Sequence, residues 1–222
     1  MFPKVTVILP VKITEKWQLH MTQCCINTMR DTTDVPFQLI VVETGSNHLA
    51  QWCDLHLQHE QPMGYAKEFN QAIDEALGDY IVHIGNDIFT RPGWLEALLK
   101  CFEIEDCGAA TLASSDLKHE AINKIMEGVY CPLMMFKKGW HFDEDYRDVF
   151  LDTDLIMRIY KTGKRMYRNW NVVIIHLNQQ TFGQQPKQQI KDKFNAGKEL
   201  FVSKHNSSNL LIYRVLTEGW TI

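Results

Sequence analysis

The chain has 222 residues, of which 45% are hydrophobic and 23% are charged, values that are ordinary for a globular protein. This length suits one large domain, or one domain with a C-terminal extension. The net charge of −4 excludes the strongly basic balance of a protein that binds nucleic acid or anionic membranes unaided. The sequence contains neither a signal-peptide pattern nor an apolar run that could cross a bilayer, and we therefore expect a cytoplasmic protein.

The cysteine spacing excludes the usual zinc and redox motifs. No two cysteines have the C-x-x-C spacing that such motifs need. The six lie at positions 24, 25, 53, 101, 107 and 131. Because their neighbours are apolar or helical, we expect buried, reduced thiols.

Strand and helix patterns alternate along the chain. The expected strands are 5–11, 37–42, 80–84, 108–112, 129–136 and 171–176. The expected helices in the first half are 16–30, 49–57 with Asn47 as its cap, 64–77 with Gly78 as its stop, and a helix that has Pro92 in its first turn. Later in the chain we expect a helix over 155–160 and an amphipathic helix from Ile190. The latter is interrupted at 206–209, and 210–216 follows. This alternation predicts an α/β domain with a mostly parallel sheet.

Polar residues follow three of the predicted strands. They are the segments Pro10–Lys12, Glu43–Ser46 and Gly85–Asp87. In open α/β sheets, ligands bind beyond the carboxyl ends of the strands. The three segments therefore predict a binding site at one edge of the sheet.

Two carboxylates among these residues have two readings each. Asp87 at a strand end can hold a divalent cation that neutralises a diphosphate, or it can cap the turn that follows. Glu43 can accept hydrogen bonds from a nucleobase or ribose, or it can bond to its own loop. Neither residue decides the question alone.

A second group of titratable residues lies later in the chain. Asp152 and Asp154 stand at the start of a helical pattern, and residues two apart on a helix do not face each other. One aspartate therefore suits the helix N-terminus, and the other suits a general base facing a cleft. His176 ends a strand, either as a core or edge residue or as a metal ligand. The basic run from Lys161 to Arg168 fits a solvated helix end.

Taken together, these residues resemble family 2 glycosyltransferases of the GT-A fold over roughly residues 5 to 180. The elements that carry the resemblance, in chain order, are Val7–Pro10, Val41–Ser46, Gly64–Ala66, Asn70–Ala72, Ala76–Ile81, Ile84–Asp87, Pro92–Leu95, Phe142–Glu144, Leu151–Leu155 with Arg158 and Gly163, and His176. Each element is a weak signal by itself, and their shared order is a strong one.

The resemblance implies a three-layer α/β/α GT-A domain over 1–183 with a mostly parallel central sheet. It leaves a C-terminal helical extension, 184–222, that packs on the domain or forms an oligomer interface such as a homodimer. The implied activity is inverting transfer of a sugar from a nucleotide-diphosphate donor to an acceptor hydroxyl, with Mn²⁺ or Mg²⁺. The implied donor is linked to UDP, GDP or dTDP. The acceptor is a glycan, a lipid-linked sugar, a protein or a modified nucleobase.

By the same resemblance, Asp152 is the base, and Asp87 and His176 hold the metal. The implied donor-binding residues are Pro10, Val11, Glu43, Lys67, Asn86 and Asp87. Three positions depart from the family pattern. Gly85 stands where the D-x-D metal motif begins, Glu43 replaces an aspartate, and Leu151 replaces the glutamate before the base.

Two other functions are compatible with these residues. The first is a catalytically silent member of the same fold that binds a nucleotide-sugar or a partner, which the missing carboxylate at Gly85 favours. The second is a nucleotidyltransferase, which would need a glycine-rich basic loop after the first strand. Residues 12–16 contain no glycine, so we rank this reading last.

Overall fold

The computed structural model describes residues 4–115, 124–128, 132–147, 149–177 and 186–206. Its centre is one nine-stranded sheet, in which eight strands follow the order β3-β2-β1-β4-β8-β6-β9-β5, and β7 pairs with β9. The strands are β1 (Val5–Val11), β2 (Phe37–Thr44), β3 (Leu55–His59), β4 (Tyr80–Ile84), β5 (Ile88–Phe89), β6 (Cys107–Ser114), β7 (Ile125–Glu127), β8 (Leu133–Lys137) and β9 (Arg165–His176).

Most strands of this sheet run in one direction. β1 pairs in parallel with both β2 and β4, β2 with β3, and β6 with β9. β8 runs antiparallel between β4 and β6, and the short strands β5 and β7 run antiparallel to β9. The mostly parallel α/β sheet that the sequence predicts is therefore confirmed.

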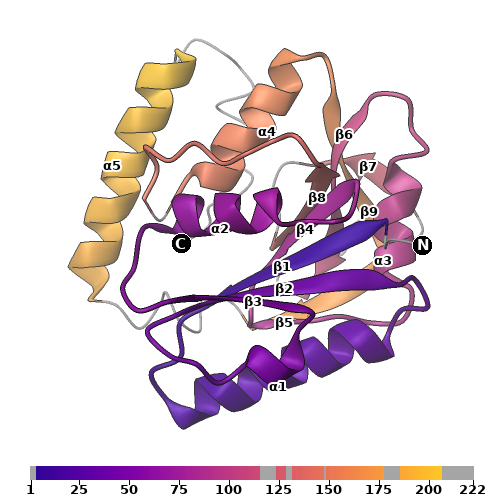
Figure 1. Cartoon of the computed structure of the whole chain (residues 1–222). Coiled ribbons are helices and arrows are strands. Elements are labelled where there is room, and N and C mark those ends of the chain that lie inside the picture. The colour runs from indigo at the N-terminus through magenta and orange to yellow at the C-terminus, as the bar shows by residue number, and fades with distance from the viewer. Residues whose placement is uncertain (1–3, 116–123, 129–131, 148, 178–185, 207–222) are drawn as a thin grey trace.

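Helices cover both faces of the sheet (Figure 1). They are α1 (Lys16–Asp31), α2 (Tyr65–Asp74), α3 (Trp94–Cys101), α4 (Leu151–Lys161) and α5 (Lys187–His205), and a single 3₁₀ turn, η1, spans Ala50–Trp52. One hydrophobic core lies between one face of the sheet and the helices α1 and α3. A second core joins α2, α4 and α5 to the other face. The result is the expected three-layer arrangement, with a C-terminal helix outside α4. None of these five helices is long and apolar enough to cross a membrane.

The helix expected over 49–57 is wrong. This segment forms η1 and then the edge strand β3. Asp54 decides the path, because its backbone N–H donates to the carbonyl of Leu39 and its side chain accepts from the N–H of Leu39. These bonds hold the chain beside β2, although Leu49, Trp52, Cys53 and Leu57 recur at helical spacing.

Several boundaries also differ from the sequence expectation. α2 ends at Asp74 rather than at 77, and α3 begins after a left-handed Gly93, so that Pro92 precedes the helix. Both Asp152 and Asp154 lie inside the first turn of α4. The strand expected over 129–136 appears as β8, and 129–131 lie outside the described residues. The segment expected over 210–216 also lies outside them.

Gly78 is required for space rather than as a helix stop. A Cβ at this position would lie 2.6 Å from the backbone N of Thr6 and 2.6 Å from the carbonyl carbon of Val5. We expect Gly78→Ala to lower the free energy of unfolding by about 3 kcal/mol, because backbone atoms of β1 cannot move aside without disturbing the sheet. Urea denaturation measures the loss. Leu77→Ala, at the preceding residue, which is 53% exposed, is the control and should change little. Equal stability of Gly78→Ala and wild type would contradict the packing explanation.

Candidate active site

The carboxyl ends of β1, β2 and β4 meet at one edge of the sheet. Pro10 lies opposite Val42, and Val11 lies opposite Glu43 in the parallel register of β1 and β2. β4 lies on the other side of β1, with His83 opposite Ile8. The strand-end segments that the sequence singles out are therefore neighbours, as parallel pairing requires.

Glu43 holds the loop that follows β2. Its fully buried carboxylate accepts hydrogen bonds from the hydroxyl of Ser46, at 2.6 Å, and from the backbone N–H groups of His48 and Leu49. A ring nitrogen of His56, Nε2, lies 2.9 Å from the same carboxylate. Burial alone would raise the pKa of Glu43, but these hydrogen bonds together hold it below its ordinary value. Glu43 thus shapes this loop, and its predicted contact with a nucleoside stays a prediction.

Asp87 and His176 come together through strand pairing. β5 follows Asp87 directly and pairs antiparallel with β9, with Ile88 opposite His176. The backbone N–H of Leu177 donates to the carbonyl of Asp87 at 3.0 Å. The Nε2 atom of His176 lies 3.7 Å from Oδ2 of Asp87, and both side chains are largely buried. The two predicted metal ligands are therefore neighbours.

In the turn Gly85-Asn86-Asp87, Gly85 has no side chain, so Asp87 supplies the carboxylate. A Cβ at Gly85 would lie 2.9 Å from Oδ1 of Asp87, so the aspartate partly covers the space above the glycine. The Cys25 thiol donates to the Gly85 carbonyl at 3.6 Å. Burial, with a smaller contribution from Asp87, raises the pKa of Cys25, so this thiol stays protonated.

The donor set here fits a divalent cation shared with a substrate. Within the described ranges, no group of three His, Cys, Asp or Glu residues comes close enough to hold a metal ion. Two ligands that are each about 2.1 Å from one cation can lie at most about 4.2 Å apart, and Asp87 and His176 meet this limit at 3.7 Å. Mg²⁺ and similar ions are commonly held by one or two protein ligands plus substrate phosphates.

Asp152 lies in the first turn of α4, two residues after a strained residue. Phe150 has φ 69° and ψ 1°, the left-handed conformation that non-glycine residues rarely adopt. The carboxylate of Asp152 accepts a hydrogen bond from the N–H of Thr153 at 2.8 Å. Burial raises the pKa of Asp152, and the hydrogen bonds from Thr153 offset only part of the increase. A raised pKa brings a carboxyl group closer to the range that suits a general base.

Asp154 has different surroundings. Its side chain is 1% exposed, and its two oxygens lie 2.7 Å from Nε of Arg158 and 2.7 Å from Nε2 of His205. Arg158 also donates to the carbonyl of His141. The two aspartates of this segment are therefore distinct, and Asp154 links α4 to its neighbours.

Tyr65 and His83 belong to the same site, although the sequence analysis did not select them. The Tyr65 hydroxyl forms a hydrogen bond with Nε2 of His83. Burial raises the pKa of Tyr65, and the negative charges of Asp152, Asp87 and then Glu68 raise it further. Tyr65 therefore lies within electrostatic reach of both the expected base and the expected metal ligand.

His83 is enclosed by rings of the neighbouring elements. Its ring lies 5.0 Å from the ring of Phe69 and 5.8 Å from that of Phe142. Burial lowers the pKa of His83 to about 4, so the imidazole is neutral near pH 7. One signal in the sequence was available: His83 interrupts the apolar run of β4.

The remaining predicted residues have separate positions. Asn86 is 8% exposed and donates from its amide to the Thr22 hydroxyl at 3.0 Å, which fastens the turn to α1. Lys67 is exposed on the first turn of α2. Asn70, further along α2, bonds in both directions with the backbone of Phe142 and so fixes the segment before α4.

The mostly parallel sheet, the helices on both of its faces and the C-terminal helix form the α/β/α fold that the sequence resemblance predicts. The family model described as glycosyl transferase family 2 matches residues 6–141. The chain belongs to this family and is a glycosyltransferase. The family resemblance expected from the sequence motifs is therefore confirmed.

Three solved structures of low sequence identity have the same fold. Residues 1–349 of TarS from S. aureus match with a TM-score of 0.66 and 14% identity, over 96% of this chain and 70% of that one. The mannosyltransferase PcManGT from Pyrobaculum calidifontis, in complex with GDP-Man and Mn²⁺, matches with a TM-score of 0.68 and 16% identity, over 97% and 68%. GalNAc-T7 with UDP, GalNAc and Mn²⁺ matches with a TM-score of 0.64 and 8% identity, over 79% and 44%.

Another structure of TarS 1–349 holds UDP, and it matches with a TM-score of 0.66 and 13% identity, over 97% of this chain and 71% of that one. The chain covers 42% of the longer TarS chain. No curated protein matches the chain significantly. At these identities the structural matches establish the GT-A fold.

Proposed function

We propose that the chain is an inverting glycosyltransferase that moves a sugar from a nucleotide-diphosphate donor to an acceptor hydroxyl. One observation carries the proposal. The half-buried Asp152, whose pKa is raised, and Asp87 of the Asp87–His176 pair are both near enough to Tyr65 for their charges to raise its pKa. A site of this kind offers a base and a cation-binding carboxylate within reach of one substrate.

In this mechanism, Asp152 accepts the proton of the acceptor hydroxyl. The hydroxyl oxygen then attacks the anomeric carbon from the face opposite the nucleotide, and the bond to the diphosphate breaks with inversion. Asp87 and His176 would hold a Mn²⁺ or Mg²⁺ ion, which supplies positive charge to the leaving diphosphate. The Tyr65 hydroxyl and the neutral His83 contribute no charge at neutral pH.

The donor would bind along the strand ends. The backbone at Pro10 and Val11 and the loop shaped by Glu43 would hold the nucleoside, and Lys67 would reach a phosphate. Asn86 would contribute by fixing the turn that carries Asp87. PcManGT in complex with GDP-Man and TarS in complex with UDP support a GDP- or UDP-linked donor. The acceptor class is open among glycans, lipid-linked sugars, proteins and modified nucleobases.

A catalytically silent, nucleotide-sugar-binding protein is the second candidate, and Gly85 is the observation that favours it. A single carboxylate binds a cation more weakly than a D-x-D pair does. Hydrolysis of UDP-, GDP- and dTDP-sugars with Mn²⁺ separates the two candidates. Intact donor binding without turnover over the whole screen would favour the silent protein.

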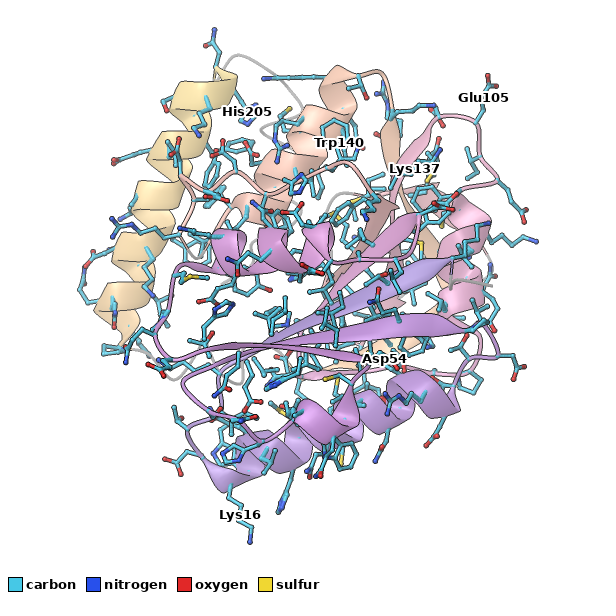
Figure 2. The ribbon with its side chains drawn as sticks, in the orientation of Figure 1. Lys16, Asp54, Glu105, Lys137, Trp140 and His205 are labelled. Carbon is cyan, nitrogen blue, oxygen red and sulfur yellow. The ribbon has the colours of Figure 1, made fainter. Side chains whose placement is uncertain are left out.

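Substitution of Asp87 tests the cation site. We expect a nucleoside diphosphate with Mn²⁺ to raise the melting temperature of the wild type, since a ligand present at 100 times its Kd stabilises a fold by about 2.7 kcal/mol. Asp87→Ala should lose the Mn²⁺-dependent part of this shift and keep the part seen without metal. Glu105→Ala is the control, because Glu105 is exposed in the loop before β6, away from the carboxyl edge (Figure 2). An undiminished Mn²⁺-dependent shift in Asp87→Ala would contradict the assignment.

A further inference from the structure

Helix α5 contacts the chain on both sides of Asp152. It lies alongside α4 on the outer surface of the domain (Figure 1). Near its C-terminal end, Lys204 pairs with Asp143 and Asp145 in the segment before α4, at 2.5 and 2.7 Å. The adjacent residue, His205, reaches into α4 itself.

His205, on α5 (Figure 2), bridges two residues of α4. It is 8% exposed, its Nε2 lies 2.7 Å from Oδ1 of Asp154, and its Nδ1 lies 2.9 Å from Nζ of Lys161. A lysine ammonium group can only donate, so Nδ1 accepts and Nε2 carries the hydrogen that is donated to Asp154. The pairing with Asp154 holds the first turn of α4, where Asp152 lies.

The middle of α5 approaches the residues before α4 closely. A Cβ at Gly197 would lie 2.7 Å from Cγ2 of Val149 and 2.9 Å from Cδ2 of Phe150. The ring of Phe201, one turn later and fully buried, lies 5.8 Å from the ring of Phe150. Glycine inside a helix is about 1 kcal/mol less favourable than alanine, so this position gives up helix stability at the point of closest contact.

These contacts surround the strained residue. A left-handed conformation at a residue such as Phe150 costs about 1–3 kcal/mol and persists only when its surroundings fix it. The surroundings of Phe150 include Gly197 and Phe201 of α5. Its carbonyl accepts from the N–H of Asp154, so the backbone of Asp152 lies within the hydrogen-bonded turn that this conformation begins.

We propose that α5 positions the catalytic base, and that His205 is a positioning residue that acts on Asp152 through Asp154. The proposal rests on the proposed function, because it needs Asp152 to be the base. It assigns α5 a direct part in the reaction geometry, beyond closing the hydrophobic core.

Three variants test the proposal. His205→Phe removes both polar contacts at similar volume. His205→Gln keeps a donor for Asp154 and an acceptor for Lys161, and it is the rescue variant. Ser203→Ala is the matched control, because the exposed Ser203 hydroxyl donates only to the Leu200 carbonyl within α5.

The readouts are hydrogen exchange of amides 151–155 and the donor-hydrolysis kinetics of each folded variant. We expect His205→Phe to speed exchange and to lower kcat by about 10- to 100-fold, since a displacement of about 1 Å can cost about 100-fold in rate. The donor KM should stay within about 2-fold, because the donor site lies on other elements. His205→Gln should recover most of kcat, and Ser203→Ala should match the wild type.

The experiments distinguish failure of the positioning role from failure of the proposed function. Unchanged exchange in His205→Phe overturns the positioning role, whatever the activity. An unchanged kcat in His205→Phe, with Asp152→Asn inactive, also overturns it and leaves the proposed function intact. A wild type that turns over no donor overturns the proposed function, and the positioning role falls with it. Should His205→Phe fail to fold, His205→Gln with wild-type exchange and kcat still supports the role, and a Gln variant as slow as Asp152→Asn overturns it.

Discussion

Asp152→Asn is expected to abolish sugar transfer and to leave the protein at least as stable as the wild type. The amide cannot accept the proton of the acceptor, and loss of a general base typically costs about 100- to 10,000-fold in rate. The free energy of unfolding should not fall, because burial raises the pKa of Asp152 and the folded state therefore disfavours its ionised form. The asparagine avoids that cost.

The stability difference between Asp152→Asn and the wild type should depend on pH. A carboxyl group with a raised pKa in the folded state destabilises the fold when it is ionised, and the cost disappears once both states are protonated. The stability advantage of Asp152→Asn should therefore be full above the raised pKa and should vanish below the ordinary aspartate range. Melting temperatures of both proteins between pH 3 and about pH 8 measure it. In the wild type, kcat/KM should fall as the pH drops through the raised pKa of Asp152.

Asp154→Asn is the informative comparison for Asp152→Asn. It lies in the same turn, but its carboxylate is paired with Arg158 and His205. We expect it to lower the melting temperature, the opposite of the result at position 152. A variant Asp152→Asn that retains wild-type turnover, or that is less stable than Asp154→Asn, would exclude Asp152 as a base with a raised pKa.

Glu43→Gln is expected to be among the most destabilising single changes at the carboxyl edge of the sheet. The carboxylate is fully buried and is bonded to Ser46, His48, Leu49 and His56. Loss of one partner of a buried charged pair typically costs about 3–5 kcal/mol, and an amide directs hydrogens at some of these donors. We expect a loss of about 3 kcal/mol in the free energy of unfolding.

The pH dependence at Glu43 has the opposite sign. Its pKa lies below the ordinary value, so the stabilisation is present above the unfolded-state pKa and is lost as the pH falls through the folded-state pKa. Urea denaturation at neutral pH should show the full difference between wild type and Glu43→Gln, and the difference should shrink in acid. Glu60→Gln, at an exposed residue after β3, is the control. A constant difference across this range would mean that the charge of Glu43 contributes nothing.

Local sequence patterns predict the strands that are short and apolar, such as β1, β2 and β4, but miss β3, β5, β7 and the first half of β9, where Arg165 and Arg168 lie in a strand and not at a helix end. β1 runs over Val5–Val11 as expected, and the polar strand ends meet because parallel neighbours share an edge. The helix prediction for 49–57 is wrong because a non-local contact decides this segment. Its apolar spacing fits a helix, but the contacts of Asp54 with β2 are made across 15 residues and no local pattern contains them.

The site was predictable only in part, because several of its contacts join distant segments. Asp87 and His176 could be selected from motif positions, and β5 brings them together. Tyr65 and His83 meet only when α2 docks on the sheet, and His205 meets Asp154 only when α5 docks on α4. These pairs are 18 and 51 residues apart, beyond the reach of helix or strand periodicity.

The turn at Gly85 limits how this enzyme could be redesigned. Introducing an aspartate there, to rebuild a two-carboxylate motif, would place its Cβ 2.9 Å from Oδ1 of Asp87. Asp87 would have to rotate, and the rotation would change its 3.7 Å distance to His176, the other proposed metal ligand. A one-step return to a two-carboxylate motif would therefore also move Asp87. Engineering for tighter metal binding has to change Asp87 and Gly85 together, or start from the His176 side of the site.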